Sequence, residues 1–235
     1  PSLTKVFVAV LLTISESDRL LLLSPPLADE LAENEEDYPS DFGKVGEFRI
    51  SSSHGNGGGG IPLYSLPLVW DGASVAQEIS TRILENEAKN LEIEDAQVLA
   101  SAVSTANLED NTDAWASIFE NLRDYLYVAL CDPSCCSMSV AILQRLITVL
   151  ALGDAAFRGS GAKSLTSTLA LLFDDSEDNQ DEESQRLVCD FLQQTGNTGP
   201  GVAASVTTLL QDFKSTRADL FASGKPLGSL LEAVM

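Results

Sequence analysis

The chain has 235 residues and a formal net charge of −21, from 35 acidic and 14 basic residues. A field of that sign repels phosphate groups, which disfavours binding to nucleic acids and to anionic membranes. Basic segments of a partner protein remain compatible with it, although the simplest interpretation is that the charge keeps the chain in solution. Hydrophobic residues make up 44% of the chain and aromatic residues only 6%, which suits a core of helices packed on helices.

The four cysteines are Cys131, Cys135, Cys136 and Cys189. Three of them crowd one helix junction, and this spacing is not that of a disulfide-rich domain. We therefore expect reduced thiols and an intracellular, cytoplasmic protein. The sequence also starts at Pro1 without an initiator methionine, so we expect it to be part of a larger protein.

The apolar run from Val6 to Leu12 resembles the hydrophobic core of a signal peptide. The polar residues 15–18 follow it in place of a small-residue cleavage site, and the run is too short to cross a bilayer. Apolar residues instead recur at helical intervals from Leu3 to Ile14, which predicts one buried helix face.

A second short helix is predicted around Leu20 to Leu23, with Ser15 or Ser17 as its N-cap. Pro26 then starts a helix that runs to about Asn34. The composition of the next stretch predicts a flexible acidic and glycine-rich insert at about residues 35–60. The proline-containing segment 61–70 is expected to lie extended over the helices.

The two helices that follow are predicted at residues 73–90 and 94–106. Apolar periodicity marks their inner faces. The first face consists of Val75, Ile79, Ile83 and Leu91, and the second includes Leu99 and Val103.

Residues 113–153 have the pattern of two antiparallel helices. Asp113 is the predicted N-cap of the first helix. Pro133 ends that helix, because proline has no N–H and keeps Asp132 out of the helical region. The apolar residues of its inner face recur at steps of three and four: Trp115, Ile118, Phe119, Leu122, Leu126, Ala129 and Leu130.

The second helix of this pair is predicted to have Ser134 as its N-cap and Gly153 as a left-handed C-cap. The break between the two helices is so short that they must fold back on each other. The predicted inner face of the second helix consists of Met138, Ile142, Leu146, Val149 and Leu150.

Leu126, Leu130, Asp132 and Pro133, followed by an apolar second helix, resemble one repeat of the HEAT or armadillo type. In such repeats an Asp-Pro turn joins an A helix to a B helix. The usual Val-Arg pair early in the B helix is missing, and Ser137 stands near that place with Met138. The resemblance implies an α-solenoid, and the alternative is an ordinary helix hairpin within a compact helical bundle.

Further helices are predicted at residues 162–173 and on either side of a turn at residues 196–201, with a last one at residues 227–235. The acidic stretch 174–183 is predicted to be a solvated loop. The faces of the two helices around the turn consist of Leu187, Val188, Phe191 and Leu192, and of Val202, Val206, Leu209, Leu210 and Phe213. We therefore expect residues 1–235 to form a single all-α domain of about nine to eleven helices, stacked as antiparallel pairs.

Several kinds of chemistry are disfavoured by the residues present. His54 is the only histidine and lies in a Ser/Gly stretch, so a Ser-His-Asp or Cys-His site would lack a rigidly held base. A single histidine also rules out nearly every usual zinc pattern with histidine ligands, and a four-cysteine site is disfavoured because the cysteines contain no C-x-x-C pair. We interpret the cysteines as small thiols that pack the helix junction.

Residues 159–164, Gly-Ser-Gly-Ala-Lys-Ser, resemble a phosphate-binding loop. A P-loop requires glycine at the positions of Phe157 and Ala162, so we predict a helix–helix linker with Ser164 as N-cap. The acids of residues 174–183 lack the glycine and the spacing of an EF-hand loop. No catalytic, cofactor-binding or metal-binding residue is therefore predicted.

These observations predict a non-catalytic protein–protein interaction domain, a scaffold or adaptor, whose acidic rim attracts basic segments of a partner. One alternative is a regulatory helical domain that engages a small GTPase, for which Arg123 and Arg145 are the basic residues in the central pair. Each is expected to extend from its helix face toward solvent. A further alternative is a structural homodimerisation module, and the sequence does not determine the oligomeric state.

Overall fold

In the computed structural model, residues 3–23, 71–85, 90–173, 181–219 and 221 are described. Every regular element among them is helical, which confirms the all-α prediction for this part of the chain. The predicted insert at residues 35–60, the segment 61–70 and the helices predicted at residues 26–34 and 227–235 lie outside the described residues.

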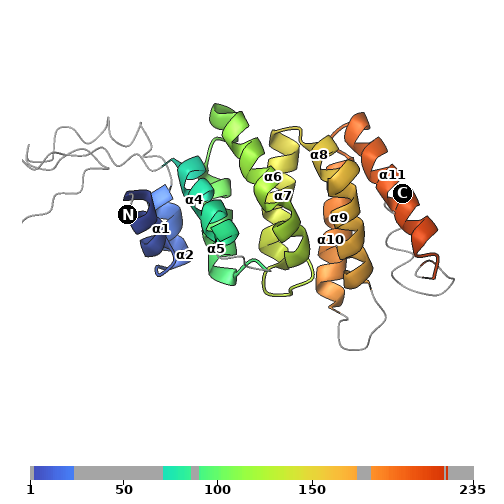
Figure 1. Cartoon of the computed structure of the whole chain (residues 1–235), viewed down its shortest axis with the longest axis horizontal. Helices are drawn as coiled ribbons and strands as arrows, with labels where there is room; N and C mark the ends of the chain where they lie inside the picture. The colour runs from blue at the N-terminus through green and yellow to red at the C-terminus, as the bar shows by residue number, and fades with distance from the viewer. Residues whose placement is uncertain (1–2, 24–70, 86–89, 174–180, 220, 222–235) are drawn as a thin grey trace, which may run out of the picture.

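The helices stand side by side along the long axis of the molecule and form two rows (Figure 1). In the first row each helix packs on the next: α1 (Leu3–Leu11), α4 (Gly72–Glu85), α6 (Thr112–Ala129) and α9 (Gly159–Leu172). The second row follows the same rule: α2 (Glu16–Leu23), α5 (Ile93–Thr105), α7 (Cys136–Val149) and α10 (Glu182–Gly196).

Short elements and one long helix complete this arrangement. A 3₁₀ turn, η1 (Leu108–Asn111), precedes α6, and the five-residue helix α8 (Gly153–Phe157) precedes α9. The last described helix, α11 (Pro200–Thr216), packs on α10 and α8. The two rows meet through the contacts of α4 with α5 and of α6 with α7.

The core lies between the rows, and the central pair contributes its largest side chains. All seven apolar residues predicted for the inner face of the first helix of this pair are buried, including Trp115 and Phe119. In α7, Ile142 and Leu146 are buried as predicted, but Val149 is 42% exposed. The prediction that Val149 belongs to the inner face was wrong. The buried face of α7 is set by its packing on α5, α6 and α10, and it includes Leu143 instead.

Three predicted caps of the central pair are wrong. Asn111, not Asp113, occupies the N-cap position of α6. Ser134 does not cap α7: its backbone N–H and its hydroxyl both donate to Oδ1 of Asp132, at 3.0 and 2.5 Å. This local Asp turn competes with capping, as short polar side chains near proline often do.

Gly153 is the third case. Ala151, with φ of 54°, takes the left-handed conformation at the end of α7, while Gly153 begins α8. A Cβ on Gly153 would lie 2.8 Å from Cγ2 of Val202 on α11. The glycine is therefore required for close packing of two helices, which local sequence rules do not reveal.

Other boundaries shift by a few residues. The helix predicted at residues 73–90 is described from Gly72 to Glu85, residues 86–89 lie outside the described ranges, and Leu91 is buried before α5. By contrast, α5 matches its predicted range to within one residue. The N-cap of α2 is confirmed as Ser15, whose Oγ accepts a hydrogen bond from the backbone N–H of Asp18 at 3.3 Å.

Candidate interaction surface

The cysteines lie in the packed core, without an arrangement suited to catalysis. Cys135, Cys136 and Cys189 are buried, and Cys131 is partly exposed. Burial raises the pKa of each thiol, for Cys189 to about 12. Protonated thiols are poor nucleophiles and poor metal ligands. Within the described ranges, no group of three or more His, Cys, Asp or Glu side chains is placed to hold a metal ion, while His54 lies outside them.

The segment that resembles a phosphate loop is helical. Residues 159–164 form the first turns of α9, so Ser164 lies inside the helix and the predicted linker was wrong. A Cβ on Gly161 would lie 2.2 Å from the carbonyl oxygen of Ala155. The glycine therefore permits the close contact between α8 and α9.

The two arginines of the central pair hold neighbouring helices together. The Nη1 and Nη2 atoms of Arg123 donate to the Ala155 carbonyl at 3.2 Å and to Oγ of Ser160 at 3.3 Å. The Nη2 atom of Arg145 donates to the Ala106 carbonyl, at the end of α5, at 3.0 Å. Because these groups are engaged within the protein, they give no support to a role in contacting a nucleotide phosphate.

The buried acid Asp95 is paired across α4 and α5. Its Oδ1 lies 3.2 Å from Nε of Arg82, whose Nη2 is 3.9 Å from Glu92. Desolvation raises the pKa of Asp95, and the Arg82 guanidinium opposes that rise. This ion pair joins the end of α4 to the start of α5, which is a structural role.

A shallow pocket lies between α1, α4 and the start of α6. Short polar side chains line it, among them Thr4, Ser74, Gln77 and Asn111. Of its two acids, Glu78 pairs with Lys5 at 3.7 Å, and Asp71 accepts a hydrogen bond from Asn111 at 3.4 Å. Both carboxylates of this pocket are therefore engaged by neighbouring side chains of the protein.

The chain reverses between successive helices, so the helices of the first row all end at one edge of the array. The helices of the second row all begin at that same edge. It lies at the bottom of Figure 1, where α6 connects to α7. We call it the lower edge.

Exposed carboxylates gather along the lower edge at the starts of the second-row helices. They are Glu16 and Asp18 at α2, Glu92 and Glu94 at α5, Asp132 before α7, and Glu182 and Glu183 at α10. Acids are favoured there because the N-terminal end of a helix carries a partial positive charge.

The prediction of a loop at residues 174–183 is wrong for its last residues, 181–183. Asp181 is the N-cap of α10 and accepts from the backbone N–H of Ser184 at 3.3 Å, and α10 has already begun at Glu182. Residues 174–180 lie outside the described ranges. The signal in the sequence was the Asp-x-x-Ser start before an apolar periodic run, which favours a helix N-terminus.

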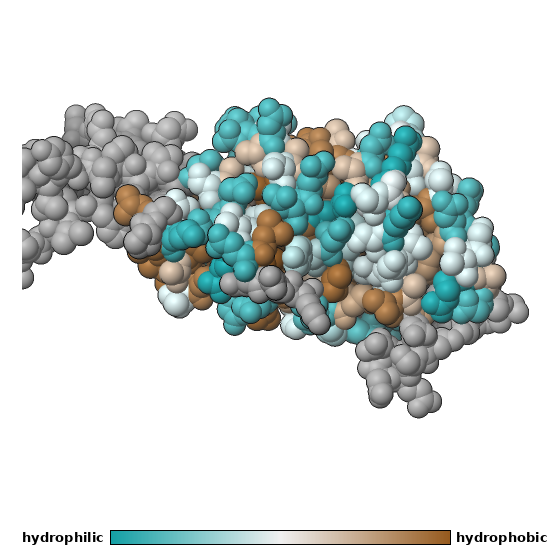
Figure 2. Space-filling model, viewed as in Figure 1, coloured by the Kyte–Doolittle hydropathy of each residue, from teal (hydrophilic) through white to brown (hydrophobic). Residues whose placement is uncertain are grey.

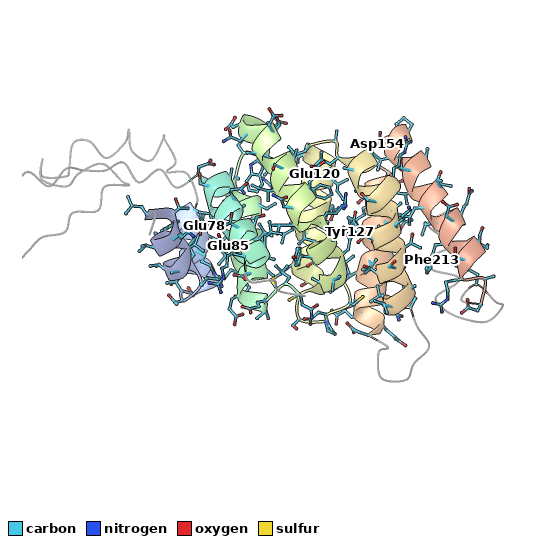
Figure 3. The ribbon with its side chains drawn as sticks, viewed as in Figure 1. Glu78, Glu85, Glu120, Tyr127, Asp154 and Phe213 are labelled. Carbon is cyan, nitrogen blue, oxygen red and sulfur yellow. The ribbon has the colours of Figure 1, made fainter. Side chains whose placement is uncertain are left out.

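Acidic residues also continue onto the outer face of the first row. Figure 3 shows Glu78 and Glu85 on α4 and Glu120 on α6, and all three lie on the outside of their helices, at least partly exposed. The buried Tyr127 of α6 instead points into the core, where its hydroxyl donates to the Ala156 carbonyl at 2.8 Å. The visible face in Figure 2 is accordingly dominated by hydrophilic residues, with hydrophobic ones scattered among them.

A scan with models of known protein families gives no match, and searches of curated proteins and of solved structures give none either. None of the described helices is long and apolar enough to span a membrane.

Proposed function

We propose that the chain is an α-solenoid of the armadillo or HEAT type, and that it serves as a non-catalytic interaction domain, a scaffold or adaptor, of a larger protein. The pattern of contacts between helices supports this architecture. Each helix of a row packs on the preceding and following helices of that row, and α4 and α6 also pack on α5 and α7 of the other row. Such stacking extends a surface in one direction, which suits the binding of elongated partner segments.

The observation that carries the proposal is the acidic lower edge. Its carboxylates are exposed, and Arg82, a cation at this edge, is already paired with Asp95 and Glu92. A surface with one sign of charge attracts segments of the opposite sign and speeds their association. The expected partner is therefore a protein with a basic segment.

The test is capture of partners from cell extract by the purified chain, with charge-reversed variants. A lower-edge variant carries Glu182→Lys and Glu183→Lys, and it should lose partners that the wild type retains. A matched variant carries Glu109→Lys and Asp110→Lys, two exposed acids of η1 at the opposite edge, and should keep them. Retention should also fall as salt rises to about 0.5 M, since screening weakens exposed charge pairs.

Equal capture by all three proteins would refute the role of the lower edge. Failure of the wild type to retain any protein in a salt-dependent manner would count against an interaction domain altogether. Light scattering on the same samples separates a second alternative, homodimerisation, from binding to a different protein.

A further inference from the structure

Four exposed apolar side chains occupy the same position in four successive helices of the first row. Each is the residue before the last of its helix: Val10 in α1, Leu84 in α4, Val128 in α6 and Leu171 in α9. Their exposed fractions are 45%, 44%, 41% and 61% respectively. Because the first-row helices end together, these residues form a line along the lower edge, and we call them the rungs.

The surroundings of the rungs make this line distinct from a general apolar surface. One helical turn earlier on α4, α6 and α9 stand polar residues: Thr81, Asp124 and Ser167. The apolar character is therefore confined to one residue per helix on these three helices. On α1 it broadens, because Leu3 and Val6 are exposed as well.

The spacing of the rungs sets the geometry of anything that could cover them. Packed helices lie about 8–10 Å apart, so consecutive rungs are separated by roughly that distance. A chain in the extended polyproline II conformation advances about 3.1 Å per residue with three residues per turn, so every third side chain lies on one face, about 9 Å from the next, and would meet a rung. A helical partner would need apolar residues about seven positions apart. The wide apolar stripe of an amphipathic helix has no counterpart at α6 and α9, where the line is one side chain wide, although Ile93 at the start of α5 is also exposed on this edge.

The charges beside the rungs define the rest of the partner. Glu85 follows Leu84 directly, and the exposed acids Glu94, Asp132 and Glu182 begin the second-row helices at the same edge. The first-row helices also end here, and a helix C-terminus carries a partial negative charge. Lysine or arginine residues between the apolar positions would meet favourable charge along the whole line.

We propose that the lower edge binds an extended, basic segment of a partner protein that carries an apolar side chain at every third position, one for each rung. This inference rests on the proposed function as an interaction domain and specifies its partner. The rungs supply apolar contacts that fix the register of the segment, and the carboxylates attract the basic residues between them.

The probe is a synthetic peptide of repeated Leu-Lys-Lys triplets, about 30 Å or ~10 residues long, which spans the four rungs in the polyproline II conformation. Binding to the full chain is measured by fluorescence anisotropy. Three control peptides are compared: the same composition with all leucines in one block, a Leu-Glu-Glu version, and a basic peptide with leucines seven positions apart. The triplet peptide should bind about tenfold or more tightly than each control.

The variant that tests the rungs carries Leu84→Ser, Val128→Ser and Leu171→Ser. All three side chains are exposed, so the fold should persist, and a thermal melt verifies this. Affinity for the triplet peptide should fall about tenfold or more. The matched control is Val149→Ser, which removes a side chain of similar exposure at the end of α7, on the opposite edge, and should leave the affinity unchanged.

Each contrary result has a definite meaning. Equal binding of the triplet and block peptides, or unchanged binding by the triple variant, would overturn this inference, while charge-dependent capture from extract would still uphold the interaction domain. Tighter binding of the seven-spaced peptide would replace the extended partner by a helix. If the wild type is a dimer and the triple variant a monomer, the occupant of the rungs is a second copy of this chain, and the peptide proposal is wrong.

Discussion

Leu146 and Arg145 are adjacent residues of α7 in opposite environments. Leu146 is 1% exposed, whereas Arg145 is exposed and donates one hydrogen bond to the Ala106 carbonyl. We expect Leu146→Ala to lower the free energy of unfolding by about 2–5 kcal/mol, through lost transfer energy and a cavity. Arg145→Ala should cost no more than about 1 kcal/mol. Urea unfolding of the two variants measures both values.

The contrast between these two variants tests the rotational phase of α7. Equal losses of stability would mean that the buried face of the helix is misassigned. The buried face of a helix is the feature that apolar periodicity predicts well. Every predicted inner-face residue of α6 is buried, since a helix between two neighbours must cover one continuous stripe.

The Cys189 thiol makes stability depend on alkaline pH. Burial raises its pKa in the folded chain from an ordinary value of 9.0 to about 12. Between these values the unfolded chain loses the thiol proton and the folded chain keeps it, so the unfolded state binds fewer protons. The free energy of unfolding should therefore fall as pH rises above about 9, by up to about 1.4 kcal/mol per pH unit for this group.

The measurement is urea unfolding of the wild type and of Cys189→Ala at neutral pH and near pH 10. The variant is expected to be less stable at neutral pH and to show a smaller decline toward high pH. Only the decline of the free energy of unfolding toward high pH tests the role of the Cys189 thiol. If it is as steep in the variant as in the wild type, Cys189 does not control it.

At the scale of single elements, two glycines in the first turns of helices should respond oppositely to substitution. A Cβ at Gly161 in α9 would lie 2.2 Å from a backbone oxygen, whereas nothing lies within 4 Å of one at Gly201 in α11. Gly161→Ala should lower the free energy of unfolding by about 1–3 kcal/mol or more, because α8 and α9 must separate. Gly201→Ala should raise it by about 0.4–1 kcal/mol, through reduced entropy of the unfolded chain.

Thermal melts of the two alanine variants, with the wild type alongside, decide this. A neutral Gly161→Ala would show that α8 does not pack on α9 as described. These glycines also show why local sequence rules mispredict helix starts and caps. Local rules assigned Gly153 as a cap and residues 159–164 to a linker, but both glycine positions are determined by close contact with another helix: Gly153 with α11, and Gly161 with the preceding helix α8.

At the scale of the whole molecule, the sequence predicted the helical class and most helix positions, because apolar periodicity reports directly on burial. It did not identify the lower edge. Leu84, Val128 and Leu171 have the same residue type as core positions, and only the positions of neighbouring helices show that they are exposed. The acids at the helix starts were visible individually, but their alignment along one edge follows from the order of packing.

The last prediction distinguishes a stack of helix pairs from a compact bundle. In a stack, stability is close to a sum of local terms and nearest-neighbour contacts, so damage at one end should stay there. Leu11 in α1 is fully buried at the first end of the array, whereas Leu146 lies in the middle. Hydrogen exchange of the full chain, read by mass spectrometry of peptide fragments, should show faster exchange in α1 and α2 for Leu11→Ala and little change in α10 and α11. Leu146→Ala should instead accelerate exchange in helices on both sides of α7, because it loosens the contacts that join the two ends. A compact bundle unfolds as one cooperative unit, so a uniform increase in exchange across all helices for Leu11→Ala would favour that alternative over the solenoid.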